Sequence, residues 1–464
     1  MKFEDAAYRL KEFWEEFRKE RNGLVGLGIL IAAVLVVILE PLILPFPEAG
    51  SRWRDITYWQ DNSKSAPPAW TNLFSRRKSA VALTLWDSRI EEKKPGEKAY
   101  IFTYDYDFSR APYDLIVCGK GSGTIPLTVR VQRPDRASVE IIRYVLQDLE
   151  GQTFRLSFTN EGRANALEFL RKVEKPENAS LIATMSYGVP EILFSISEPD
   201  FVRGPKPLSG RYEIEVTAGF TDARASIEHL EIVVVGRVSG ILGTDSMKRD
   251  IFSGVVAGLK WALLIGLLTS IVSVLVGVFY GITAAYFGGR VDSVMMLIFD
   301  YFISLPVLPI LIVFSAVYKP SIWTIIAALI LFFWVGPVKT VRSMALQIKE
   351  ETYIEAAKAL GAGHGRIIFR HMAPLLIPYS FASMALAVPG AIVYESSVSL
   401  LGLGDATIVS WGQILHDALG SGAVLSGLWW WVVPPGLLIA VMGMTFAFLG
   451  FAMDKILHPK LKTR

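Results

Sequence analysis

The sequence predicts a polytopic α-helical membrane protein that carries a large, mainly-β domain between its first and second transmembrane helices. Three observations lead to this fold class. The chain of 464 residues has a mean hydropathy of +0.39 and is 52% hydrophobic yet 20% charged, so its polar and apolar parts must be segregated. Six apolar runs are long enough to cross a bilayer. The segment 46–240 instead alternates apolar and polar residues in the manner of β-strands.

The first element expected is a cytoplasmic amphipathic helix over residues 1–21, which mixes acidic and basic residues. The apolar run 23–44 follows and is 22 residues long. As a helix it would measure roughly 33 Å, enough for one span. No small-residue cleavage pattern follows the run, so residues 22–45 are predicted to be a permanent transmembrane helix and not a cleaved signal.

Residues 46–240 are expected to form an extracytoplasmic domain. Short strand-like stretches recur between turn residues at 100–104, 124–131, 138–145, 154–158, 192–196, 212–216 and 232–235, with one helix near 165–173. Seven or eight short strands in about 190 residues favour a β-sandwich. His229 is the only histidine of this segment, which argues against a histidine metal site or a serine–histidine hydrolase.

Residues 241–464 contain the other five predicted spans, near 254–285, 303–317, 322–341, 375–395 and 431–453. Lysine and arginine gather in the N-terminal tail, in 339–370 and after 454, whereas 396–430 has neither. The positive-inside rule therefore places both termini and the loop 348–373 in the cytoplasm and 46–240 outside. The charged stretch 245–250 is expected to lie as an amphipathic helix on the outer surface.

The loop 348–373 is a charged segment of helix, glycine turn and second helix between two apolar runs. Glu355, Ala356 and Ala357 form a small-residue patch beside one carboxylate, and Gly361 stands where a helix would end in a left-handed conformation. Alanines let another protein approach closely, and a carboxylate accepts a charge-assisted hydrogen bond from an arginine. The pattern predicts a docking surface, although the spacing alone also fits an ordinary surface helix.

Asp300, Pro306 and Glu395 are candidates for a translocation pathway or gate. The two acids are the charged residues deepest in or nearest to the apolar spans, where a charge facing lipid is costly. A proline loosens a helix where motion is needed. Positions at the two membrane boundaries, or plain packing, are the alternatives. No catalytic, metal or cofactor-binding residue is predicted.

Glu-Ala-Ala at 355–357 followed by Gly361 resembles the coupling loop of ABC-importer membrane subunits. Further motifs resemble the dipeptide/oligopeptide permeases in order along the chain: Gly243-Thr244-Asp245 with Arg249-Asp250, Tyr286-Phe287-Gly288-Gly289, Ser304-Leu305-Pro306, Arg366 to His371, and Ser399 to Gly404. The sequence departs from the family at Met372-Ala373-Pro374, where an aliphatic pair usually precedes the proline. The resemblance covers most of the chain after 240 but not 46–240, where such permeases have a short loop.

This resemblance implies a type I ABC-importer permease core in an ATP-driven importer of dipeptides or oligopeptides. The partners it implies are a second homologous permease, two cytoplasmic ABC ATPase subunits, an extracytoplasmic substrate-binding protein and the lipid bilayer, but no nucleic acid. The chain has no Gly-rich loop ending in Gly-Lys-Ser/Thr, so it is expected not to be an enzyme. ATP and Mg would be held by the partner ATPases.

Other functions remain open at this point. Similar machinery imports oligosaccharides or nickel. A membrane-anchored ligand sensor or scaffold would need only the first span. A proton- or sodium-coupled carrier would show ionisable residues at the midplane of several spans, and these are scarce here.

Overall fold

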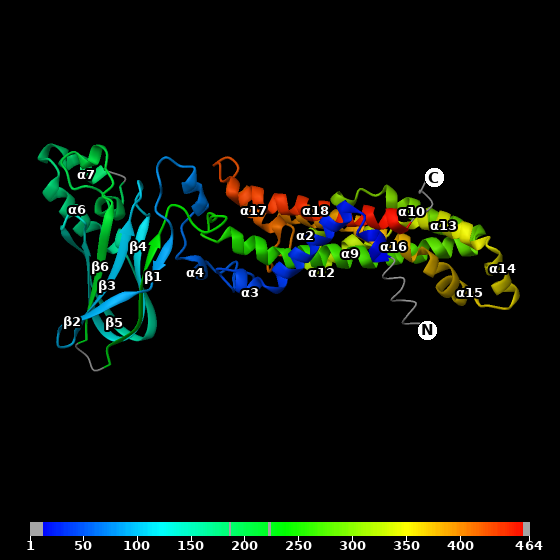
Figure 1. Cartoon of the computed structure of the whole chain (residues 1–464), viewed down its shortest axis with the longest axis horizontal. Helices are drawn as coiled ribbons and strands as arrows, with labels where there is room; N and C mark the ends of the chain where they lie inside the picture. Colours follow the sequence, from blue (N-terminus) through cyan, green and yellow to red (C-terminus); the bar gives the residue numbers. More distant parts are fainter. Residues whose placement is uncertain (1–12, 185–186, 221–223, 458–464) are drawn as a thin grey trace. The chain divides into compact units, whose positions relative to one another are not determined.

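The computed structural model describes residues 13–184, 187–220 and 224–457, so most of the helix predicted over 1–21 and the basic residues after 457 lie outside the described residues. The chain divides into two compact units (Figure 1). Unit 1 comprises Met1–Trp53 and Ser253–Arg464, and unit 2 comprises Arg54–Phe252. The sequence sets apart 46–240, and unit 2 begins and ends several residues later.

All regular secondary structure in the described part of unit 1 is helical. Four helices there are long and apolar enough to cross a membrane: α2 (Arg21–Ile38), α9 (Ile251–Phe287), the continuous run His364–Leu400, and Trp429–Ile456 within α18 (Trp429–Leu457). Two bent pairs qualify only together: α10 (Gly289–Ser304) with α11 (Val307–Val317), and α12 (Ile322–Phe333) with α13 (Val338–Lys349). The described part thus holds four spans, or up to six if each bent pair is one span. The unit also contains the shorter helices α3 (Glu40–Ile43), α14 (Thr352–Ala359) and α17 (Trp411–Gly420).

The bend in the first pair corrects the expected straight span over 303–317. The angle between α10 and α11 is 80°. Leu305, which follows α10, adopts an extended conformation with φ −77° and ψ 133°. A residue before proline is disfavoured in the helical region, and Pro306 itself has no N–H to donate. The helix therefore ends before Pro306 and restarts after it.

Unit 2 is built on antiparallel strands that form one seven-stranded sheet in the described residues (Figure 1). The strands are β1 (Leu83–Leu85), β2 (Ser88–Lys94), β3 (Glu97–Tyr106), β4 (Asp114–Gln132), β5 (Ser138–Ser157), β6 (Gly210–Gly219) and β7 (Ser226–Val235). Their order is β1-β7-β4-β6-β3-β2, and β5 pairs with β4 outside that path.

The short strands predicted at 124–131, 138–145 and 154–158 are parts of two longer strands, β4 and β5. β7 pairs with the first part of β4 and β6 with its second part, so one strand joins both halves of the sheet. The pairing of β4 with β5 shifts register around Gly121 and Gly123. Glycines add no side chain to an alternating pattern, so the sequence pattern did not predict the first half of β4 as a strand.

The helix predicted near 165–173 is confirmed as α6 (Arg163–Val173). The strand predicted at 192–196 is wrong, because its first part belongs to α8 (Val189–Leu193). The backbone N–H of Gly188 donates to the Glu191 carboxylate, and Pro190 stands in the first turn, which are both helix-start signals. The other short helices of unit 2 are α4 (Ile56–Trp59), η1 (Ala69–Leu73), α5 (Phe158–Glu161), η2 (Pro176–Asn178), α7 (Ala179–Thr184) and η3 (Phe201–Arg203).

The stretch 245–250 is a turn with buried charged residues and not the expected amphipathic surface helix. Asp245 and Arg249 are 0% and 1% exposed, and their side chains form an ion pair. The Asp245 carboxylate also accepts the backbone N–H groups of Met247 and Arg249. Lys248 has a positive φ of 67°. These contacts satisfy the backbone locally, so no helical ladder is needed.

Candidate functional site

The loop singled out by the sequence connects α13 to α16 (Ala373–Leu400). It contains α14 (Thr352–Ala359), α15 (His364–Arg366) and the π-helix η4 (Ile367–Met372), which runs on into α16. Figure 1 shows α14 and α15 at one end of the helices of unit 1. The loop is therefore continuous with α16 through η4, whereas α14 stands apart from that run.

The inner side of α14 is held by one residue. Ile354 is the buried residue of this helix and packs in an apolar cluster with Ile282 of α9, Val341 of α13 and Ile367. The outer side carries large apolar groups, since Leu360, which caps the helix, is 88% exposed. Large apolar side chains on a protruding segment of this kind mark a surface for another protein.

The residues predicted for docking lie on this outer side. Glu355 and Ala356 are exposed and Ala357 is half-buried. The Glu355 carboxylate forms no ion pair with any residue that the structure describes, so it is available to a partner's cation. A carboxylate and a small side chain are thus exposed next to each other on α14, and Ala357 borders its buried side.

The turn after α14 has the geometry expected of a helix that stops abruptly. Gly361 has φ +79°, which confirms the predicted left-handed conformation. Its N–H donates to the Lys358 carbonyl at 2.9 Å, and the N–H of Ala362 donates to the Ala357 carbonyl at 3.0 Å. This pair of bonds is a Schellman motif, and it turns the chain back toward α15.

A hydrogen bond ties the loop to the end of α9. The Tyr286 hydroxyl lies 2.7 Å from Nδ1 of His364, and Tyr286 is only 7% exposed. The Lys358 ammonium stands 5.7 Å from the centroid of the Tyr286 ring, within the range of a cation–π contact. Tyr286 belongs to a motif noted in the sequence, but no sequence pattern pointed to His364 as its partner.

The helix that leads into the loop, α13, is fixed to α9 and α10. The Arg342 guanidinium donates to both oxygens of Asp292, at 2.6 and 2.5 Å. At Gly277 of α9, an added Cβ would lie 2.2 Å from the Trp334 carbonyl oxygen, and at Gly281 it would lie 2.8 Å from that of Val338. The helix backbones are therefore close enough to exclude any side chain at these positions, as in small-residue membrane interfaces.

The three predicted pathway residues lie apart from the loop. Asp300 is largely exposed and forms an ion pair with Lys339 at 3.3 Å. Pro306 stands at the bend between α10 and α11. Glu395 is 4% exposed, and the Ser399 hydroxyl donates to it at 2.7 Å. In the described residues no ion pair or hydrogen bond joins these three side chains to each other or to Glu355.

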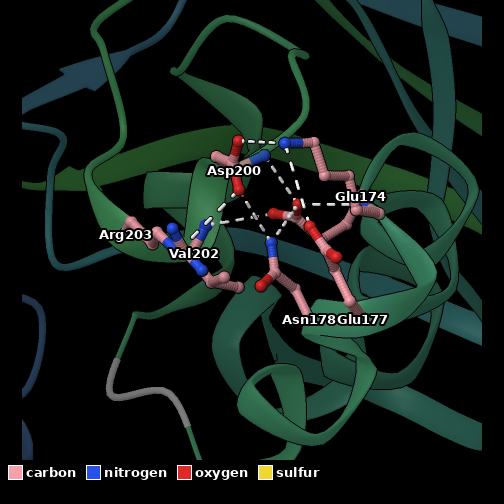
Figure 2. Close-up of polar contacts among 7 residues, drawn as sticks. Glu174, Glu177, Asn178, Asp200, Val202 and Arg203 are labelled. Atoms are coloured by element: carbon pink, nitrogen blue, oxygen red, sulfur yellow. Dashed lines mark hydrogen bonds and ion pairs between the residues drawn. The ribbon is translucent and has the colours of Figure 1, made fainter.

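A second polar cluster orders a turn of unit 2 (Figure 2). The Glu174 carboxylate, at the end of α6, accepts the backbone N–H groups of Lys175, Asp200 and Val202 at 3.0, 2.6 and 3.1 Å. The Asn178 side-chain amide donates a fourth bond at 2.9 Å. Burial pushes the pKa of Glu174 up, but these four bonds outweigh it and leave the pKa below its usual value. The carboxylate is occupied by the chain's own donors, so this cluster is structural.

Two protein-family models match this chain. The model of the binding-protein-dependent transport system inner membrane component matches residues 273–463, and that of the N-terminal TM domain of oligopeptide transport permease C matches residues 9–68. Residues 69–272, which include most of unit 2, lie outside both matches.

Curated relatives agree with these models. The dipeptide transport system permease protein DppC of Bacillus subtilis (strain 168) is 38% identical over 221 residues, which are 47% of this chain and 68% of the relative. The oligopeptide transport system permease protein OppC of the same organism is 33% identical over 47% of this chain and 72% of its own length. The peptidoglycan transport system permease protein YejE of Agrobacterium fabrum is 35% identical over 35% of this chain and 43% of the relative.

One solved structure also aligns with the chain, that of the MetNI methionine ABC transporter in inward-facing conformations. The alignment covers 46% of this chain and 97% of the MetNI chain at 19% identity, with a TM-score of 0.32. A score this low carries no argument about the fold.

Proposed function

This chain belongs to the family of inner membrane components of binding-protein-dependent transport systems, and on that premise we propose that it is the permease subunit of an ATP-driven importer of dipeptides or oligopeptides. Each bent helix pair would count as one of six spans. Both termini would then lie in the cytoplasm, and unit 2 would lie outside. Labelling of single introduced cysteines from either side of sealed vesicles tests this orientation.

The proposal depends on α14, an exposed helix that is held to the rest of unit 1 by one buried residue. Its outer face offers Glu355, the alanines and Leu360, and its inner residue Ile354 joins the apolar cluster of α9 and α13. An ATPase subunit that holds ATP and Mg would grip the outer face. A second homologous permease would complete the pathway, and an external binding protein would deliver the substrate.

The contacts around the loop support its action as a lever. The loop is joined to α9 by Tyr286 and His364, and α13 is joined to α10 by Arg342 and Asp292. A displacement of α14 is therefore passed to the long helices and not absorbed within the loop. Rocking of these helices would alternate the pathway between inward-open and outward-open states. The bend at Pro306 and the buried Glu395 are the proposed gate or pathway elements.

The first experiment reverses the charge of the docking face. Glu355→Lys is expected to leave the protein inserted in proteoliposomes with its partners but to lower peptide uptake roughly tenfold or more, because a charge-assisted bond is replaced by repulsion. ATP hydrolysis and uptake are measured together. The matched control is Glu350→Lys, an exposed glutamate in the turn before α14, which should keep uptake. Wild-type uptake by Glu355→Lys would rule out this docking face.

A second experiment removes the bond between the loop and α9. Tyr286→Phe keeps the ring but loses the hydroxyl that faces His364, so fewer peptides should be imported per ATP hydrolysed while the ATPases still bind. Tyr301→Phe, on a ring that is 66% exposed in α10, is the control and should keep the normal ratio. Equal ratios in both variants would show that this bond is not part of the lever.

A peptide substrate is proposed because the similar proteins are dipeptide and oligopeptide permeases. The transporter reconstituted with its own binding protein should accumulate dipeptides or oligopeptides. If the transporter accumulates oligosaccharides or nickel instead, it is still an importer, but its substrate is not peptide.

A further inference from the structure

Unit 2 carries a protruding loop, residues 72–79, that is closed at its base by one side chain. The Asn72 amide donates to the Ser79 carbonyl at 2.9 Å and accepts the Ser79 N–H at 3.0 Å. The preceding helix η1 is fixed in turn. The Trp70 indole N–H donates to the Ile241 carbonyl at 2.9 Å, and the Ala69 N–H donates to that of Gly240 at 3.0 Å. The tip, residues 73–78, is thus held out from a rigid base.

The tip of the 72–79 loop combines two large apolar side chains with three cations. Leu73 and Phe74 are 81% and 82% exposed and take no part in the apolar core of the sheet. Arg76, Arg77 and Lys78 follow, all exposed, and none of them pairs with a carboxylate in the part of the chain that the structure describes. The partly exposed Trp70 ring lies 6.3 Å from that of Phe74 and enlarges the apolar surface.

We propose that the 72–79 loop is a membrane anchor that lies in the bilayer interface. Leu73 and Phe74 would enter the boundary of headgroups and acyl chains, and the three cations would contact anionic phospholipid headgroups. Apolar and aromatic side chains next to lysine and arginine form the composition of interfacial segments. Long cationic side chains keep their charge in the headgroup layer while their stems lie on apolar surface.

The position of the loop in the chain favours lipid as the occupant. Unit 2 is an insertion between two membrane-spanning helices. Ile241, which accepts the Trp70 bond, precedes the first residue of α9, Ile251, by only ten residues. The base of the loop is therefore bonded to the chain ten residues before a helix that is long and apolar enough to cross a membrane. The proposal rests on this multi-span topology but not on the substrate or on the loop at α14.

The test measures immersion depth in the full-length chain, assembled with its partners in nanodiscs. A nitroxide is attached at Phe74→Cys, with the buried Cys118 replaced by alanine. The matched control is Ile90→Cys on β2, another apolar side chain of unit 2 that is 58% exposed. The label at 74 should show a several-fold higher ratio of oxygen to nickel-chelate accessibility than the label at 90. Equal ratios would overturn the proposal.

A second arm tests the cations and the competing occupant. In nanodiscs that contain phosphatidylglycerol the label at 74 should lie deeper than in phosphatidylcholine alone. That difference should vanish when Arg76→Gln, Arg77→Gln and Lys78→Gln are combined. If the label loses solvent contact only after an external substrate-binding protein is added, the loop is a protein-docking surface and the proposal is wrong. Either failure leaves the importer assignment intact, because Glu355→Lys tests that on unit 1.

Discussion

The two units hold an irregular turn beside a helix end by different means. In unit 1, α13 and the loop that follows it are positioned by backbone packing, since Gly277 and Gly281 of α9 leave no room for a side chain against the residues before and within α13. In unit 2, the turn after α6 is positioned by the Glu174 carboxylate, which accepts four N–H bonds (Figure 2).

The difference follows from the solvent of each unit. Helices of unit 1 expose large apolar side chains, such as Leu297 at 71% and Ile38 at 66%, as expected for surfaces that face lipid. Lipid is as apolar as these side chains, so burying them does not drive the helices together, and close packing must do so. Unit 2 buries an apolar core that includes Phe102, Tyr212 and Ile232. The hydrophobic effect holds that unit together, and charged hydrogen bonds order its turns.

The largest effect is expected where backbone packing is broken. Gly277→Leu places a side chain against the Trp334 carbonyl, only 2.2 Å from the new Cβ, so α9 and α13 must separate. We expect a loss of about 3 kcal/mol of stability, seen as a lower melting temperature in detergent. Gly28→Leu in α2 is the control, because nothing lies within 4 Å of its Cβ position. Equal melting temperatures would contradict the role given to packing.

The next effect is expected in unit 2. Glu174→Ala leaves three backbone N–H groups and the Asn178 amide without their acceptor, which should cost roughly 3 kcal/mol. Hydrogen exchange of residues 174–203 in the full-length chain measures it. The control is Glu168→Ala, which removes only an exposed ion pair with Lys172 on the same helix and should change nothing measurable. Unchanged protection in Glu174→Ala would show that the cluster is not needed.

The role of the Glu174 carboxylate also predicts how the stability of unit 2 depends on pH. The pKa of Glu174 is lowered in the folded state, so its stabilising contribution is complete above the unfolded value of about 4.3 and is lost as pH falls through the folded value. Thermal unfolding of the full-length chain should therefore show unit 2 weakening as the medium is acidified below that value. In Glu174→Gln, which cannot titrate, this part of the acid-induced loss of stability should disappear. If the melting temperature falls equally with acid in both proteins, other groups cause the acid sensitivity.

The smallest effect is expected at the turn after α14. Gly361 and Gly363 are two residues apart, and nothing lies within 4 Å of either Cβ position. Only Gly361 has a positive φ, +79°, whereas Gly363 has φ −65°. Gly361→Ala should therefore cost about 1 kcal/mol through backbone strain alone, and Gly363→Ala should be close to neutral. Hydrogen exchange in α14 and peptide uptake measure the difference, and equal behaviour of the two variants would contradict it.

Features that depend on neighbouring residues were predictable from the sequence. The apolar runs, the separate segment 46–240 and the helix α6 follow from the kind and spacing of side chains. So does the left-handed Gly361, because a helix stop and a glycine stand next to each other. The exposure of Glu355 and Ala356 likewise follows from a short charged segment between apolar runs.

Only the tertiary structure decided the features that join distant parts of the chain. Tyr286 meets His364 across 78 positions, and β4 pairs with β6 and β7, two strands from the C-terminal end of unit 2. The stretch 245–250 was expected to be a surface helix, but it is a turn because the buried Asp245 carboxylate accepts the backbone N–H groups of Met247 and Arg249. Such contacts leave no periodic trace, because each partner's residue type is common and only the folded chain brings the two within reach of a hydrogen bond.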